Sequence, residues 1–318
     1  MRRILVTGAS GFVGGSFLRS FQDRDGVEIC GLGRRKTEFR NYVRADLGRS
    51  LELDWRPDIV IHAAARSSPW GRLSEFRRQN VLATQHIVDF CEKKRVDRLI
   101  YISSSSVFYR DGDQFDITED SPIGPSFVNH YARTKYEAEG IALSFSGETA
   151  ILRPRAVFGP HDTVLFPRIL NAAKAGRMVS ISRPGPPCIG DLIYIDSLTS
   201  YILQAATEDS LSGAFNLTNG EPVEIQRFIA EIFAKLGLPP IEKSIPRQRA
   251  MFIAGLFEKV FGCCVPWLEP PITRFGVGVL SYSKTFDVSK SVATFGPPSV
   301  GLAEGVDRFV KWQTQQQF

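Results

Sequence analysis

The chain has 318 residues, of which 43% are hydrophobic and 23% are charged, and this composition is typical of a globular protein rather than a disordered one. Its net charge of +5 comes from 39 basic and 34 acidic residues, and the basic residues are scattered along the chain. A nucleic-acid surface would need a coherent basic stripe, so we expect no nucleic-acid partner. Five cysteines without a CxxC pair predict reduced thiols and give no disulfide framework.

Two features bear on where the protein is located. The apolar run after Arg2-Arg3 ends at Thr7-Gly8, which is too short for the apolar core of a signal peptide. No segment approaches the roughly 18 apolar residues of a membrane span. We therefore expect a cytoplasmic protein without an integral membrane segment.

Strands and helices alternate along the first half of the chain. Apolar strands are expected at 3–7, 27–32, 59–62, 98–103 and 149–154, and helices at 11–23, 73–94 and 131–145. This alternation predicts βαβ units, and strands that are apolar on both sides fit a parallel sheet covered on both faces. The expected fold class is α/β, a Rossmann-type doubly wound parallel sheet with a smaller, interleaved C-terminal substrate subdomain.

The second half is less regular. Helices are expected at 165–176, 196–207, 225–236 and 302–314, the second with Asp196 as its N-cap, and strands at 189–195 and 214–217. The region 240–300 is expected to break into short pieces around paired prolines. We assign residues 1–158 to a dinucleotide-binding domain that also takes elements from 189–217, residues 159–188 and 218–300 to a substrate-binding subdomain, and 301–318 to a C-terminal helix.

A glycine-rich loop separates the first strand from the first helix. Glycines at positions 8, 11 and 14 allow a tight turn, a close approach of the backbone to a pyrophosphate, and close packing of helix on strand. The anion would lie at the helix N-terminus. This context predicts a dinucleotide site that contains Gly8, Ser10, Gly11, Phe12, Val13 and Gly14.

The end of the second strand bears on the choice of cofactor. It carries Arg34 and Arg35 where an acidic residue would bind a ribose 2′-hydroxyl. Arginines pair with a 2′-phosphate, which favours NADP over NAD, although these arginines could also simply face solvent. Asp46 and Leu47 are expected at the adenine. The small residues Ala63, Ala64 and Ala65 are expected beside the cofactor, and His62 is expected to pack.

Tyr131 and Lys135 stand four residues apart on one helix face. Free tyrosine and lysine have pKa values near 10 and near 10.4, and a neighbouring ammonium lowers the pKa of a tyrosine, which would make it an acid or base near neutral pH. Such a spacing is common by chance. Its partner is the serine run 103–106 at the end of an apolar strand, where hydroxyls can polarise a carbonyl.

Together these motifs resemble the extended short-chain dehydrogenase/reductase family, also called the NAD-dependent epimerase/dehydratase family. The resemblance rests on the glycine loop, HAAA at 62–65, Asn80 in NVLAT, the serine run, YARTK and LRPRAVFGP, and it covers essentially the whole chain. It implies that Ser104 is the catalytic serine, with Ser105 as the fallback. Tyr131 would be the acid/base and Lys135 would tune it and bind the nicotinamide ribose. Asn80 would support the fourth-strand region, and Pro154 would line the nicotinamide pocket.

The reaction is narrowed by departures from the family pattern. Members that dehydrate nucleotide sugars carry Asp-Glu after the catalytic threonine, whereas this chain has Ser105-Ser106, which argues against dehydration. LRPRAVFGP, GDLIYIDSL and EPPITR are similar to the 3β-hydroxysteroid dehydrogenase-like branch. The expected function is NAD(P)-dependent interconversion of a secondary alcohol and a ketone on an apolar or β-keto/hydroxy-acid substrate. The alternatives are a nucleotide-sugar 4-epimerase or reductase and a non-catalytic NAD(P)-binding protein.

The remaining expectations concern substrate and partners. Trp70, Ser105, Arg155 and Phe166 are expected to contact a small-molecule substrate, and no metal site is expected. The apolar stretch 250–264 could be a lid, a peripheral membrane contact or an ordinary packed helix. The resemblance also implies a homodimer formed through the helices after Leu73 and Tyr131.

Overall fold

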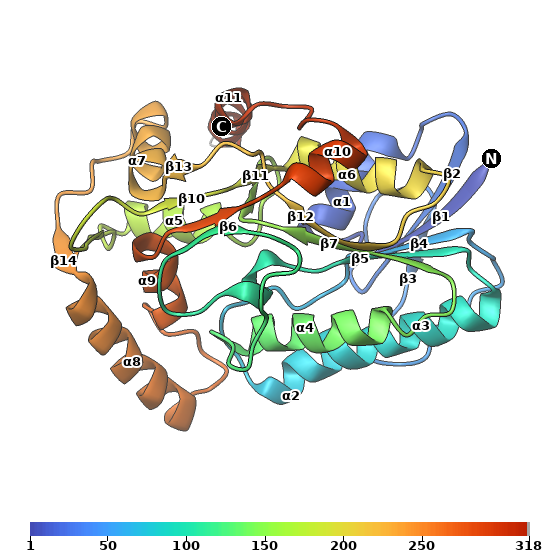
Figure 1. The fold of residues 1–318 in the computed structure, drawn as a ribbon, viewed down its shortest axis with the longest axis horizontal. Helices are drawn as coiled ribbons and strands as arrows, with labels where there is room; N and C mark the ends of the chain where they lie inside the picture. Colours follow the sequence, from blue (N-terminus) through green and yellow to red (C-terminus); the bar gives the residue numbers. More distant parts are fainter. Residues whose placement is uncertain (317–318) are drawn as a thin grey trace.

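A seven-stranded parallel sheet forms the centre of the computed structural model, which describes residues 1–316 (Figure 1). The strand order is β12-β7-β5-β4-β1-β2-β3, and every neighbouring pair is parallel. The order runs outward in both directions from β1, so the expected doubly wound sheet is confirmed. The strands are β1 (Arg2–Thr7), β2 (Val27–Gly33), β3 (Tyr42–Arg44), β4 (Ile59–His62), β5 (Arg98–Ile102), β7 (Glu148–Pro154) and β12 (Gly213–Leu217).

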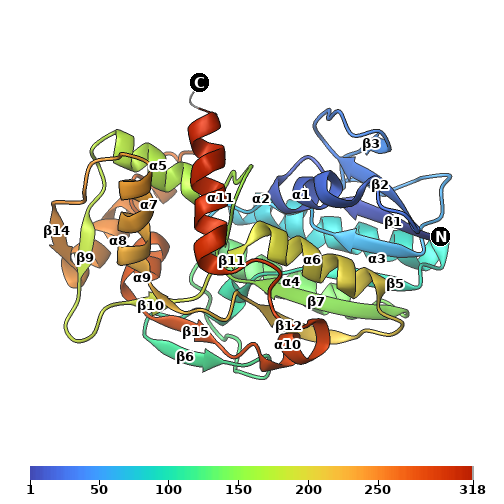
Figure 2. The ribbon, with the colours of Figure 1, turned by 90° about the horizontal axis from the view of Figure 1, so that it is seen from above.

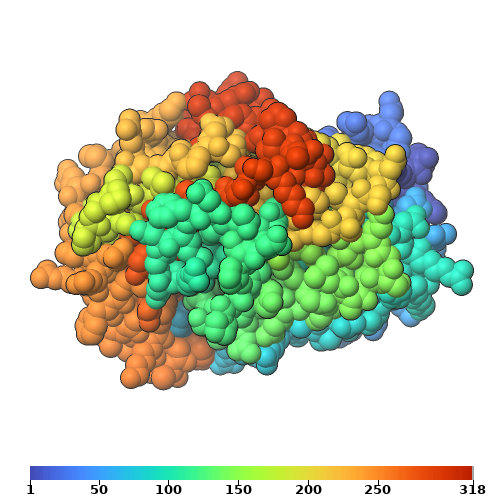
Figure 3. Space-filling view, in the orientation of Figure 1, coloured from blue at the N-terminus to red at the C-terminus, as the bar shows by residue number. Residues whose placement is uncertain are grey.

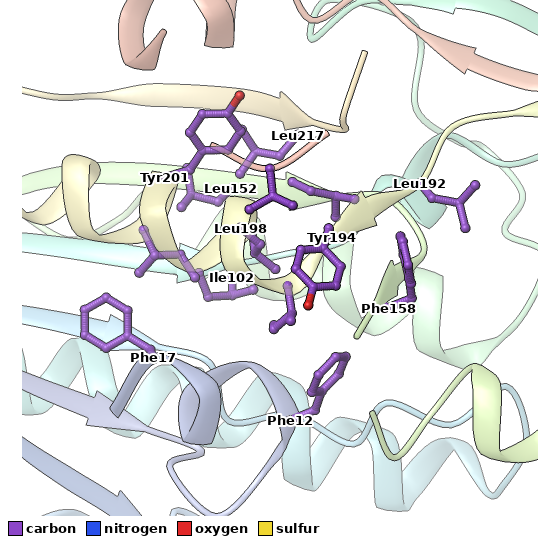
Figure 4. Packing of buried hydrophobic residues seen from close by; sticks show 14 of the residues in the cluster. Phe12, Phe17, Ile102, Leu152, Phe158, Leu192, Tyr194, Leu198, Tyr201 and Leu217 are labelled. Atoms are coloured by element: carbon purple, nitrogen blue, oxygen red, sulfur yellow. The ribbon is translucent and has the colours of Figure 1, made fainter. Parts of the chain in front are cut away.

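Helices cover both faces of this sheet, as Figures 1 and 2 show. On one face lie α1 (Phe12–Phe21) and α6 (Ile195–Thr207), and on the other lie α3 (Ala83–Lys94) and α4 (His130–Ala142). Successive residues of a strand point to opposite faces, so β1 places Ile4 in the first core and Leu5 in the second. Figure 4 shows side chains of α1, α6 and the sheet gathered in the first core. This two-sided burial explains why the strands are apolar without alternation.

The predicted helix 73–94 is continuous but not uniform. It consists of α2 (Leu73–Phe76), the π-helical turn η1 (Arg77–Leu82) and α3. Asn80 lies in the π turn, where its Oδ1 accepts from the Arg66 N–H at 2.7 Å and its Nδ2 donates to Thr134 Oγ1 at 3.0 Å. Such turns are frequent at functional sites. Here the turn ties the loop after β4 to α4.

The C-terminal elements gather at one end of the sheet (Figure 2). They include α5 (Phe166–Lys174), β9 (Ser180–Ser182), α7 (Ile225–Lys235), β14 (Ser244–Pro246), α8 (Arg247–Cys264) and α9 (Arg274–Ser281). A second sheet, in the order β13-β10-β15-β6, joins segments far apart in the chain. Its strands are β6 (Gln114–Ile117), β10 (Ile189–Gly190), β13 (Val223–Glu224) and β15 (Lys284–Phe286). The segment that holds β6 lies at the front of the molecule beside these elements, in teal in Figure 3.

Three expectations about the second half need correction. The predicted strand 189–195 is split into β10 and β11 (Ile193–Tyr194), and β11 pairs with β8 (Val157–Phe158). Asp196 is not an N-cap, because α6 begins at Ile195 and Asp196 lies in its first turn, paired with Arg308 at 3.0 Å. The region 240–300 also contains α8, which has 18 residues, as well as short pieces such as α10 (Ser289–Phe295).

Two helices of the C-terminal part differ in how well they match the sequence expectations. The last helix, α11 (Leu302–Gln315), matches the predicted one, and the final two residues of the assigned segment 301–318 lie outside the described residues. Helix α8 packs through Ala250 and Ala254, while Phe252 is 75% and Leu256 is 56% exposed. It is therefore not the ordinary packed helix that was one expectation. Among residues 1–316 no helix is long and apolar enough to cross a membrane.

A buried ion pair fastens α4 to the sheet. The guanidinium of Arg153, on β7, donates to Glu139, on α4, from Nη2 at 2.7 Å and from Nε at 3.0 Å. The Ser103 hydroxyl, at the end of β5, donates to the same carboxylate. Both members of the pair are nearly inaccessible to solvent. Because the carboxylate is buried, its stability depends on these partners.

We predict that Arg153→Met lowers the free energy of unfolding by about 3–5 kcal/mol, since it leaves a buried carboxylate without its cation. The double variant Arg153→Met/Glu139→Gln should be less destabilised than Arg153→Met alone, because the amide carries no charge to bury. Urea denaturation of the wild type, both single variants and the double variant measures the coupling. Additive losses would contradict this role of the pair.

Candidate active site

The carboxyl ends of β1, β4, β5 and β7 open into a cavity of about 1070 Å³. Ligands of open α/β sheets bind at this edge. The cavity continues between the sheet and the C-terminal elements. On the sheet side its lining contains Gly8, Ser10, Gly11, Phe12, Val13, Gly14, Arg34, Arg35, Asp46, Leu47, Ala63, Ala64, Ala65, Ser104, Ser105, Tyr131, Lys135 and Pro154. Residues predicted from separate motifs are therefore brought together in one place.

The loop from β1 to α1 is built for close backbone approach. Gly8 has φ +70°, and a Cβ at this position would lie 2.7 Å from the backbone carbon of Ala63. A Cβ at Gly14 would lie 2.7 Å from the Gly8 oxygen, so α1 packs directly on the loop. Helix α1 begins at Phe12 without a side-chain cap, which leaves its first N–H groups available. This cradle fits the pyrophosphate of a dinucleotide.

The part of the cavity next to the end of β2 is basic. Arg35 donates to the Ser10 carbonyl, and its own carbonyl accepts from the Tyr42 hydroxyl at 2.6 Å. The Arg34 carbonyl accepts from Arg44 Nε at 3.0 Å. Within residues 1–316 the Arg34 guanidinium has no ion pair, and it borders the cavity. Asp46 is exposed, and its Oδ1 accepts from the Gly48 N–H at 3.1 Å.

Lys135 is 1% exposed and projects toward the end of β5. Its Nζ donates to the Ile102 carbonyl at 2.6 Å and lies 4.1 Å from the centre of the Tyr101 ring. Burial lowers the pKa of Lys135 to about 7, although the Glu139 carboxylate acts in the opposite direction. The amino group of Lys135 is thus held behind the reaction site rather than at the surface.

Tyr131 and Ser104 face each other across the cavity wall. Burial raises the pKa of Tyr131, and its interaction with the Ser104 hydroxyl lowers it. The pKa of Tyr131 is raised overall and not lowered as expected, and the Lys135 Nζ is directed at Ile102 and Tyr101. Ser104 Oγ lies 2.9 Å from Ser106 Oγ and accepts from the Ser106 N–H at 3.2 Å. These contacts orient the serine.

Two predicted supporting residues lie behind the cavity. His62 is fully buried, with Nδ1 2.7 Å from Thr7 Oγ1 and Nε2 3.1 Å from Thr84 Oγ1, and burial lowers its pKa to about 3. It is therefore packed, as expected, and its burial favours the neutral form. Asn80 is 1% exposed and does not line the cavity. Its expected place among the cofactor-binding residues needs correction, because its amide holds the loop after β4 from behind.

The substrate side of the cavity is largely apolar. It is formed by α5, β9, α9 and the segment 269–273. This segment belongs to EPPITR, one of the motifs on which the family resemblance rests. The apolar residues that line this side include Leu165, Ile169, Met178, Val179, Ile181, Ile272, Phe275, Val277 and Leu280. Arg168 also lines it, but its guanidinium is paired with Glu269 at 3.0 Å. This wall fits a substrate with an apolar body.

The four residues expected at the substrate are divided by the structure. Ser105 and Arg155 line the cavity. Phe166 does not: it is 1% exposed and packs in the core with Phe158 and Phe309, so this expectation is wrong. Trp70 lies off the cavity, against the α8 residue Gly262, and only the preceding residues 67–69 line it. The sequence alone does not distinguish an apolar side chain that lines the cavity wall from one that packs in the hydrophobic core.

Tyr109 and the α9 residues were not anticipated from the sequence. Tyr109 directly follows the 3₁₀ turn η2 (Ser105–Phe108) and lines the cavity with Ser105. Its closeness in sequence to the serine run could have marked it as a site residue. The α9 residues come to the cavity only through tertiary packing, and no local pattern marks them.

Several curated proteins are similar to this chain over nearly its full length. The 2-alkyl-3-oxoalkanoate reductase of Shewanella oneidensis is 29% identical over 328 residues, covering 95% of this chain and 84% of that protein. The decarboxylating sterol-4-alpha-carboxylate 3-dehydrogenase erg26 of Schizosaccharomyces pombe is 30% identical over 340 residues, covering 98% and 97%.

Solved structures show the same fold. MoeE5 in complex with UDP-glucose and NAD superposes with a TM-score of 0.76 at 24% identity, covering 99% of this chain and 100% of that one. The Bordetella bronchiseptica enzyme WbmH in complex with NAD⁺ gives a TM-score of 0.75 at 17% identity and full coverage of both chains. The model of the NAD dependent epimerase/dehydratase family matches residues 4–218. The chain belongs to this family and is an NAD(P)-dependent oxidoreductase.

Proposed function

We propose that this chain interconverts a secondary alcohol and a ketone, with Ser104, Tyr131 and Lys135 as its catalytic residues. The observation that carries the proposal is the position of the Tyr131 hydroxyl beside Ser104, in a cavity whose opposite wall is apolar. The names of the relatives agree, since one is a reductase of 3-oxoalkanoates and another a 3-dehydrogenase of sterol carboxylates.

The proton chemistry follows from the residues on the sheet side. A bound nicotinamide supplies or accepts the hydride. Tyr131 donates a proton to the carbonyl oxygen during reduction and takes it back during oxidation. The Ser104 hydroxyl, fixed by Ser106, donates a hydrogen bond to the same oxygen. Lys135 lies behind Tyr131, supports its proton transfer and binds the nicotinamide ribose. Binding the ribose would draw its amino group away from the Ile102 carbonyl.

A nucleotide-sugar 4-epimerase or reductase is the second candidate. Arg155, Arg168 and Arg177 all line the cavity, and arginines bind diphosphates. Against it, Arg168 is already paired with Glu269, and most of the substrate wall is apolar. The two candidates differ in cofactor turnover, because an epimerase regenerates its cofactor in each cycle.

The purified protein is expected to consume NADPH when it is offered a panel of ketones with apolar chains, followed by the fall in NADPH absorbance. Tyr131→Phe should lower turnover by about 10²-fold or more, because it removes the proton donor, and should leave cofactor affinity largely unchanged. Tyr136→Phe is the matched control, since that tyrosine is exposed on the same helix. Turnover retained in Tyr131→Phe would refute the assigned role, and epimerisation without net NADPH consumption would support the second candidate.

The lowered pKa of Lys135 predicts how the free energy of unfolding depends on pH. This pKa is about 7 in the folded protein and near 10.4 in an unfolded chain. Between these values the unfolded chain binds the extra proton, so raising the pH stabilises the folded state. We expect the free energy of unfolding to rise between about pH 7 and pH 9 by roughly 1 kcal/mol per pH unit more in the wild type than in Lys135→Met. Urea denaturation without added cofactor measures it, and parallel pH profiles would contradict the lowered pKa.

The preference for NADP rests on Arg34. We propose that its guanidinium binds the 2′-phosphate, so Arg34→Ala should weaken NADPH binding roughly 10- to 100-fold and change NADH binding far less. Arg40→Ala is the control, because Arg40 is exposed, pairs with Asp23 at 3.3 Å and lies off the cavity. Fluorescence titration with both cofactors checks this. An equal loss for NADH and NADPH would remove the argument for 2′-phosphate recognition.

Two further expectations stay predictions. Leu82, Tyr136 and Leu143 are exposed on or beside α3 and α4, the helices that the resemblance assigns to a homodimer. The apolar side of α8 is exposed beside the segment 269–273, in keeping with a lid or a peripheral membrane contact.

A further inference from the structure

Arg155 is a buried arginine that lacks a carboxylate partner. It is 4% exposed, and its Nε has no hydrogen-bond partner. The comparably buried arginines all have one: Arg98 is paired with Glu148, Arg153 with Glu139, and Arg183 with Asp113. Among residues 1–316 no carboxylate oxygen lies within 4.0 Å of the Arg155 guanidinium. A buried cation left in this way is costly unless an anion joins it.

The surroundings of this guanidinium form part of the cavity wall. Its Cζ lies 4.9 Å from the centre of the Tyr109 ring, which in turn stacks on Phe275 at 6.3 Å. The Tyr109 hydroxyl is buried near the Ser105 hydroxyl and the Arg155 guanidinium, and among residues 1–316 it makes no hydrogen bond of ordinary geometry. Arg155, Tyr109 and Phe275 all line the cavity. A buried guanidinium without a carboxylate in contact and a buried phenol hydroxyl therefore lie together on one wall of the space that receives the substrate.

The charges near Arg155 are of both signs. Lys284 is 3% exposed, and its Nζ lies 5.8 Å from the Tyr109 ring centre. Asp191 is fully buried, and its Oδ2 accepts from the Phe286 N–H at 2.8 Å. Burial raises the pKa of Asp191 to about 6, although Arg155 acts in the opposite direction. Asp113 and Asp111 act on Lys284, and its Nζ donates to the Arg110 and Gly112 carbonyls. Arg155 has no carboxylate in contact among residues 1–316, so its guanidinium is the cation here that can take an added anion.

The position of Arg155 along the chain sets its relation to the reaction site. It directly follows Pro154 at the end of β7, and Ser105, next to Ser104, contributes to the environment of Tyr109. An anion on Arg155 would thus belong to a substrate whose carbonyl lies at Ser104 and Tyr131. The remaining wall, with Met178, Val179 and Leu280, is apolar and suits a hydrocarbon chain.

We propose that Arg155 and the Tyr109 hydroxyl bind a carboxylate of the substrate, which makes the substrate an oxo or hydroxy acid with an apolar tail rather than a neutral ketone. The proposal rests on the proposed function for the identity of the reacting group. The carboxylate site itself does not depend on turnover, because it can be occupied by an acid that does not react.

The first test measures binding alone. Calorimetric titration of the protein with decanoate, a saturated carboxylate, should show binding that Arg155→Met weakens roughly 10- to 100-fold and that Tyr109→Phe weakens less. Arg227→Met is the control, because Arg227 is an exposed arginine on α7 that pairs with Glu231 and lies off the cavity. Failure of decanoate to bind the wild type, or equal binding to wild type and Arg155→Met, would overturn the proposal. Unchanged dinucleotide binding shows that each variant is folded.

The second test compares a 3-oxo acid with its methyl ester. The wild type should prefer the acid in kcat/KM, and Arg155→Met should reduce that preference by a similar factor while turnover of the ester persists. An unchanged ratio would overturn the proposal. If neither compound turns over but decanoate still binds through Arg155, the proposed function fails and the carboxylate site stands. Binding of UDP-glucuronate through Arg155, without decanoate binding, would overturn the apolar tail and assign the carboxylate to a sugar acid.

Discussion

The carboxylate of Glu139 is the interaction on which the geometry of the site depends. It is buried on α4, one turn after Lys135, and receives hydrogen bonds from Ser103 on the segment after β5 and from Arg153 on β7. A buried carboxylate cannot shift without losing these partners. The helix that carries Tyr131 is therefore held at one position against the two strands whose ends carry the serine run and Pro154.

That same burial sets the protonation of the reacting groups. Burial favours the uncharged form of both Tyr131 and Lys135, because it raises the pKa of the first and lowers that of the second. Tyr131 is therefore kept in its protonated form, which can donate a proton. The negative charge of Glu139 offsets part of the cost of a charged Lys135, which links the fastening of α4 to the readiness of the lysine to become an ammonium again.

Local patterns predicted the elements well wherever one face or both faces of an element are buried throughout its length. The strands of the main sheet and α1, α3 and α4 are of this kind, and the glycine loop and YARTK lie where they were expected. The failures concern tertiary placement. No local pattern distinguishes Phe166, in the core, from an aromatic wall, or Asn80, behind the cavity, from a cofactor ligand. The α9 wall arises from packing between distant segments.

Arg153 and Arg155 show how one strand end serves both structure and recognition. They are two residues apart, so an extended backbone turns them to the same side, and each guanidinium lies 4.9 Å from the ring of one of two successive aromatic residues, Phe108 and Tyr109. Arg153 meets Glu139 and closes the interior. Arg155 is the first residue after β7, lies too far from Glu139 to pair with it, and faces the cavity. A charge that the fold does not neutralise is thereby held where a substrate can neutralise it.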